Sequence, residues 1–207
     1  MSKKSFTSHS RWNRLFSGVV AISGVAALCF GLTQSVSADV ADRKTTITFS
    51  APVEVPGKVL PAGTYVFKLL DSSSNRNIVE IFDKDEKKLY ATLLAIPDYR
   101  PQPYDKTMVK FEERPSGSPE AIEAWFYPGD PYGMKFVYPH KRAVELAKRT
   151  NHNVLSMPDT QTATISTTAT SASDAGIKEM QNAEVTGVNG SGDSIALDVI
   201  IVSKPQP

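Results

Sequence analysis

The stretch that decides the fold runs from residue 64 to residue 96 and reads TYVFKLLDSSSNRNIVEIFDKDEKKLYATLLAI. Three apolar segments rich in β-branched and aromatic residues are separated here by two polar ones. Tyr65, Phe67 and Leu69 occupy alternate positions in the first segment, so they would share one face of a strand. The polar segments DSSSNRN and KDEKK have the composition of loops and turns. The stretch therefore predicts a three-stranded meander with short loops.

Strand-like segments also flank this meander, at residues 45–55, 107–113, 123–127 and 135–138. The prolines in residues 97–104 predict an extended loop there, because proline removes a backbone donor and disfavours a central strand. A helix is predicted for HKRAVELAKRTN, residues 140–151, where Ala143, Leu146 and Ala147 fall on one face. We therefore expect a mainly β protein, a small antiparallel sandwich or barrel-like domain with one short C-terminal helix, followed by a flexible tail.

Residues 1–38 have the pattern of a secretory signal. An apolar run at 16–32 follows a basic start, and the small residues of Val36-Ser37-Ala38 predict cleavage before Asp39. The basic residues are Lys3, Lys4, Arg11 and Arg14. The protein is thus expected to be exported, periplasmic or secreted. The alternative is an uncleaved inner-membrane anchor, because the 16–32 run is near the lower limit of a membrane span, roughly 17–25 residues. The membrane would then be contacted through this segment alone.

Removal of the signal would change the chemistry of the chain. Cys29 is the single cysteine, so the exported form would have no disulfide and no thiolate ligand for a metal. Loss of four basic residues from 23 Lys+Arg leaves 19 against 22 Asp+Glu, which turns the net charge from +1 to −3. A mildly acidic chain does not favour nucleic-acid binding.

The composition changes after Pro158. Residues 159–176 are dominated by Ser, Thr and Ala, which predicts a disordered linker between a β domain at 39–158 and a C-terminal segment at 177–207. That last segment has the pattern of a hairpin, with strands at 183–188 and 195–202. Because an isolated hairpin is marginally stable, we expect it either to dock on the main domain or to pair with a partner chain.

Aromatic density between residues 125 and 138 provides the candidate ligand site. The predicted ligand-binding residues are Trp125, Tyr127, Tyr132, Tyr138, Asp130 and Arg100. Alternation along a strand would send one set of rings into the core and leave the other exposed. An exposed set would stack against a polysaccharide or a proline-rich peptide. The other interpretation is that all of these rings pack in the core and hairpins.

The motifs of the common catalytic and metal sites are missing from the sequence. His140 and His152 lack the spacing of a metal site, there is no Gly-x-Ser-x-Gly elbow, and no glycine-rich phosphate loop is present. No cofactor and no metal are therefore expected. We expect an exported, non-enzymatic β module for binding or envelope structure. The alternative is a secreted hydrolase that uses carboxylates near the aromatic segment 125–138, such as Glu123 or Asp130.

Four stretches carry a resemblance to a known group of proteins. They read TFSAPVEVPGKVLPAGTYVFKLLDS, AIPDYR, FEERPSGSPEAIEAWFYPGD and FVYPHKRAVELAK. In these stretches the chain resembles uncharacterised exported proteins of acidobacterial type, over roughly residues 45–150. The resemblance implies an exported β domain in a bacterium. It implies no activity and no functional residues.

Overall fold

The computed structural model describes residues 43–71, 77–112, 117–160 and 174–198, all within the unit Asp39–Pro207. The predicted signal segment with its cleavage site, most of the predicted linker and the last nine residues lie outside these ranges. In the described part, no helix combines the length and the apolar character needed to cross a membrane.

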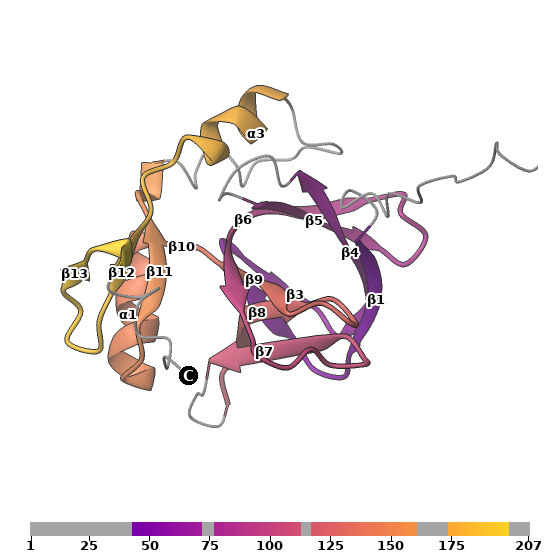
Figure 1. The fold of residues 1–207 in the computed structure, drawn as a ribbon, viewed down its shortest axis with the longest axis horizontal. Coiled ribbons are helices and arrows are strands. Elements are labelled where there is room, and N and C mark those ends of the chain that lie inside the picture. The colour runs from indigo at the N-terminus through magenta and orange to yellow at the C-terminus, as the bar shows by residue number, and fades with distance from the viewer. Residues whose placement is uncertain (1–42, 72–76, 113–116, 161–173, 199–207) are drawn as a thin grey trace, which may run out of the picture. The chain divides into compact units, whose positions relative to one another are not determined.

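The expected mainly β class is confirmed (Figure 1). The larger sheet contains β1 (Lys44–Phe49), β2 (Val53–Val55), β3 (Lys58–Leu60), β4 (Gly63–Asp71), β5 (Asn77–Asp83), β6 (Leu89–Tyr99), β7 (Met108–Glu112), β8 (Glu120–Phe126) and β9 (Tyr132–Phe136). The smaller sheet contains β10 (Tyr138–Pro139), β11 (Val154–Met157), β12 (Thr186–Val188) and β13 (Ser194–Ile195). The helices in the described ranges are α1 (His140–Thr150) and α3 (Asp174–Gln181).

The predicted meander is present as β4, β5 and β6, paired antiparallel in sequence order. Phe67 lies opposite Ile81, and Ile81 lies opposite Ala91, so the alternate apolar residues share one face. β1 adds to the outer side of β4, with Thr45 opposite Phe67. The residues on this face join one apolar core with Trp125, Phe136 and their neighbours.

The expected loop at residues 97–104 begins later than predicted, because β6 continues to Tyr99 and pairs with β9. The backbone N–H of Arg100 donates to Pro131 and that of Val137 donates to Leu94. Hydrogen-bonded pairs alternate along an antiparallel ladder, so Pro97 occupies a pair without hydrogen bonds and its nitrogen points away from β9. The pairing of β5 with β6 has already ended at Ala95. Proline is therefore tolerated here because no ladder bond is lost.

β8 lies between neighbours on both edges. β7 pairs along residues 121–126, whereas β2 pairs in parallel with the start of β8 and β9 pairs with its end. Within the described residues the sheet is not closed into a barrel, since β1 and β7 are not paired. The rings of Phe49 on β1 and Phe111 on β7 nevertheless approach to 6.3 Å between centroids.

The predicted helix is confirmed as α1, and its buried residues are the predicted Ala143, Leu146 and Ala147. They pack with Ala121 of β8 and with Tyr138. Asn151 ends the helix in the left-handed conformation, with φ 56°, and its N–H donates to Ala147. This is an αL cap of the kind that terminates many helices.

The C-terminal segment differs in part from the expectation. α3 was not predicted, and it is stabilised by tertiary contacts: Met180 and Ile177 pack with Ile78 and Leu94 of the larger sheet. The expected hairpin is present as β12 and β13, although its second strand is short. β12 pairs antiparallel with β11. The hairpin therefore docks on the smaller sheet through β12, as one of the two expectations had it, and pairing with a partner chain stays a prediction.

Candidate functional site

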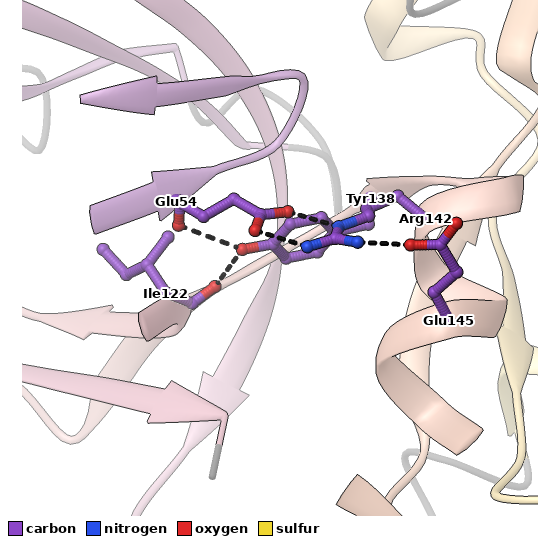
Figure 2. Close-up of polar contacts among 5 residues, drawn as sticks. All are labelled: Glu54, Ile122, Tyr138, Arg142 and Glu145. Atoms are coloured by element: carbon purple, nitrogen blue, oxygen red, sulfur yellow. Dashed lines mark hydrogen bonds and ion pairs between the residues drawn. The ribbon is translucent and has the colours of Figure 1, made fainter. Parts of the chain in front are cut away.

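Two of the predicted site residues belong to the core, which corrects the expectation that they face a ligand. Trp125 and Tyr138 are each 1% exposed. Trp125 packs edge-on against Phe67, with ring centroids 5.9 Å apart. The hydroxyl of Tyr138 donates to the carbonyl of Ile122 at 2.8 Å and lies 3.3 Å from that of Glu54 (Figure 2). Both rings are therefore part of the packed interior and stabilise the fold.

Tyr127 and Asp130 also have structural partners. Tyr127 is half-buried and packs against the main core. The carboxylate of Asp130 forms an ion pair with Arg43 and accepts the backbone N–H of Tyr132 at 2.8 Å. Asp130 thereby holds the turn before β9 and sets the position of Tyr132.

The exposed aromatic residues form a separate group. In the part of the chain that the structure describes, the exposed large apolar side chains are Val59, Tyr99, Tyr104 and Tyr132. Tyr132 is 52% exposed and lies opposite Tyr99 on the neighbouring strand, with ring centroids 5.3 Å apart. This pair lacks ladder hydrogen bonds, the arrangement in which cross-strand side chains come closest. We call the pair of Tyr99 and Tyr132 the tyrosine surface.

Arg100 and Tyr104 form a second group on the opposite face of these strands, because successive residues of a strand point to opposite faces. The guanidinium of Arg100 lies 4.0 Å from the ring centroid of Tyr104 and 5.2 Å from that of Phe126, which are cation–π distances. It also donates to the Tyr104 hydroxyl and to the sulfur of Met108 at 2.9 Å. The carbonyl of Tyr104 accepts the N–H of Gly129. The ring of Tyr104 is therefore held in place by contacts within the protein.

Gly133 makes this arrangement sterically feasible. A Cβ at Gly133 would lie 2.4 Å from the ring of Phe126, far inside contact distance. The absence of a side chain allows Phe126 to lie across β9 and underneath Arg100. An open hollow of about 390 Å³ borders Tyr104 and is lined by Tyr104, Asp105, Lys106, Thr107 and Met108.

The carboxylates considered for a hydrolase are engaged in separate ion pairs. Glu123 pairs with Lys135 at 3.0 Å, and Asp130 pairs with Arg43. Glu112 lies elsewhere, buried at the end of β7, where burial and the charge of Glu123 raise its pKa to about 7. In the described ranges, no group of three or more His, Cys, Asp or Glu residues is arranged to hold a metal ion.

A buried ion pair not anticipated from the sequence joins the larger sheet to α1. Arg142 donates to both carboxylate oxygens of Glu54, at 2.5 and 2.7 Å, and also to Glu145 (Figure 2). The hydrogen bond with Glu54 raises the pKa of Arg142. The two residues are 88 positions apart. No periodicity or motif indicates such a pair, and it became visible only in the tertiary structure.

Two further hollows were not predicted either. One of about 660 Å³ lies between the end of β1 and the start of β8 and is lined partly by Phe49, Phe111 and Glu120. The other, of about 340 Å³, includes His140, whose Nδ1 lies 3.0 Å from the hydroxyl oxygen of Ser156. Ser156 is 1% exposed within β11, so its hydroxyl is not presented to a substrate.

No protein-family model, curated protein or solved structure matches this chain. Its function therefore has to be inferred from the geometry of its own surface.

Proposed function

We propose that this protein is an exported, non-enzymatic β module that binds a polysaccharide through the tyrosine surface. The observation that carries the proposal is the contact between Tyr99 and Tyr132, two of the four exposed large apolar side chains in the described ranges, with ring centroids 5.3 Å apart. Scattered apolar residues on a surface need no explanation, whereas a cluster of large ones is typical of a binding site. Tyrosine suits this role because it joins an apolar ring to a polar hydroxyl.

The geometry of the rings favours a sugar over a proline-rich peptide. A proline-rich peptide lies in a groove between aromatic side chains. Here the ring centroids of Tyr99 and Tyr132 are 5.3 Å apart and the rings are tilted by 56°. There is therefore little room for a proline ring between them. A sugar needs only a ring face for its C–H groups and hydroxyls or carboxylates at the edge. The tyrosine hydroxyls can both donate and accept hydrogen bonds.

The proposed location outside the cytoplasm rests on the pattern of residues 1–38. A chain without cysteine after Asp39 suits an oxidising compartment, because it has no thiol to oxidise. Whether the protein is periplasmic, secreted or anchored by residues 16–32, the tyrosine surface would lie outside the cytoplasm. The hydrolase alternative receives no support, since Glu123 and Asp130 are each neutralised by a neighbouring cation.

The proposal is tested by titrating the purified protein with soluble bacterial envelope polysaccharides and following binding by calorimetry. Ring stacking contributes about 0.5–1.5 kcal/mol per residue, so Tyr132→Ala and Tyr99→Ala should each weaken binding roughly twofold to tenfold. Val59→Ala is the matched control, because Val59 is 49% exposed but lies outside the surface. Equal losses in the control, or no binding by the wild type, would contradict the proposal. Binding of a proline-rich peptide in place of polysaccharides would also contradict it.

A further inference from the structure

Glu112 occupies a position where a carboxylate is costly. Its side chain is 3% exposed, and its cross-strand neighbour is Ala121 of β8. Ala121 also lies opposite Glu54 of β2 on its other side. Cross-strand partners face the same side of a sheet, so two buried carboxylates flank Ala121. This is the side on which α1 packs, because Ala121 belongs to the cluster of Ala143 and Leu146.

The two carboxylates meet opposite ends of α1. Glu54 is bound by Arg142 in the first turn of the helix. Glu112 is approached by His152, which follows the helix, with Nδ1 and Oε2 4.0 Å apart. Arginine keeps its charge throughout the accessible pH range. Burial raises the pKa of Glu112 to about 7, so only the second end of the interface depends on pH near neutrality.

Among the described residues, the other charged groups that face Glu112 come from three strands of the sheet. They are Lys110 of β7, Glu123 of β8 and Lys135 of β9. Glu123 and Lys135 pair with each other at 3.0 Å, so the charge of Lys135 acts on both Glu123 and Glu112. Burial raises the pKa of Glu112 most, Glu123 raises it further, and Lys135, His152 and Lys110 lower it, which leaves it at about 7.

We propose that loss of the Glu112 proton above neutral pH releases the turn after α1 from β7. With the proton present the side chain is a neutral acid, which is compatible with burial. Without it, a buried carboxylate faces Glu123 and lies 4.0 Å from the largely exposed His152 of the turn. Such a group is relieved by opening to water.

The structure also indicates what moves. Asn151 of this turn contacts the loop of the β12–β13 hairpin so closely that a Cβ at Gly190 would lie 2.3 Å from its Oδ1. A Cβ at Gly192 would similarly meet Lys148 of α1. Release of the turn would therefore loosen the hairpin contact as well. The Glu54–Arg142 pair does not titrate near pH 7 and would keep the first turn of α1 attached to β2.

Amide hydrogen exchange on the full chain, corrected for the intrinsic rate, tests this between pH 5.5 and 8.5. For one proton released, opening of residues 150–153 should rise up to about tenfold per pH unit above the midpoint. Glu112→Gln should remove this dependence. Glu123→Gln should move the midpoint to lower pH, because it removes a like charge and frees Lys135. Glu120→Gln, an exposed residue of the same strand, is the control and should leave the midpoint unchanged.

An unchanged pH dependence in Glu112→Gln, or an unmoved midpoint in Glu123→Gln, would overturn the proposal. If Glu112→Gln does not fold, the carboxyl carbon of Glu112 can be titrated by NMR in the wild-type chain. A midpoint near the ordinary value of 4.5 would then also overturn it. None of these measurements involves the tyrosine surface, so the proposed binding function stands or fails separately.

Discussion

Arg142 on α1 and Glu54 on β2 form a two-bond ion pair with N–O distances of 2.5 and 2.7 Å. The Glu54 side chain is 9% exposed, so the pair lies largely out of water. The Tyr138 hydroxyl approaches the backbone carbonyl of the same glutamate. This ion pair thus holds α1 and the smaller sheet to β2, the first strand of the β2–β3 hairpin.

Breaking this pair from one side should be strongly destabilising. Arg142→Met would leave the Glu54 carboxylate buried without its cation, a situation that costs about 3–5 kcal/mol of unfolding free energy. Denaturant unfolding of the two proteins measures the difference. Lys141→Ala is the control, because Lys141 is 87% exposed and its 3.8 Å pair with Asp159 is open to solvent, so its effect should stay within about 0.5 kcal/mol. Equal losses for the two variants would contradict a structural role for the buried pair.

Stability should fall as the pH rises through neutrality because of Glu112. Its pKa is raised from 4.5 in the unfolded chain to about 7 in the fold, so the folded state binds the proton more tightly. The resulting stabilisation is fully present below pH 4.5 and is lost as the pH rises through about 7. It amounts to about 3 kcal/mol. The measurement is the unfolding free energy of wild type minus that of Glu112→Gln between pH 4 and 9, and a constant difference would refute the prediction.

Gly133→Ala should disturb the packing of Phe126 beneath Arg100. Its Cβ would lie 2.4 Å from the Phe126 ring, and overpacking of this kind costs about 1–3 kcal/mol. Displacement of the ring should also weaken its contact with Arg100. Gly63→Ala is the matched control, since its Cβ would meet Tyr65 at an ordinary 3.5 Å. Thermal unfolding of both variants compares them, and a similar loss in each would argue against the close approach as the cause.

The aromatic residues should separate into two classes by mutation. Trp125→Ala should lower the unfolding free energy by about 3–5 kcal/mol, because it removes a 1% exposed ring from the core. Trp125→Phe should cost much less, since the indole N–H has no hydrogen-bond partner among the described residues and the smaller ring lacks this donor. Tyr132→Ala should change stability by roughly 0.5 kcal/mol or less. Chemical denaturation monitored by circular dichroism distinguishes the two classes.

Local patterns were sufficient to predict much of the fold. Alternation of apolar residues predicted the meander of β4, β5 and β6, and the three-to-four spacing of Ala143, Leu146 and Ala147 predicted the buried face of α1. The predicted end of β6 was wrong, because a proline costs a ladder hydrogen bond only where its nitrogen points toward a neighbouring strand. α3 was missed because its stability comes from contacts with distant residues such as Ile78 and Leu94.

The candidate site was predicted only in part. Tyr132 belongs to the tyrosine surface and Asp130 holds the turn before it, whereas Trp125 and Tyr138 are buried in the core. Arg100 lies with Tyr104 on the other face of the strands. Tyr99 completes the surface although it lies in the proline-rich stretch, far from β9 in the sequence. Pairing of Tyr99 with Tyr132 across two strands brings them together.

By itself the sequence determined the β class, the meander, the buried face of α1 and the docking-prone hairpin, because each depends on residues a few positions apart. The tertiary structure decided which aromatic rings are buried, which carboxylates are paired and where Glu112 meets His152. These depend on strand register and on contacts between residues as far apart as Glu54 and Arg142, and no local pattern of side chains encodes them.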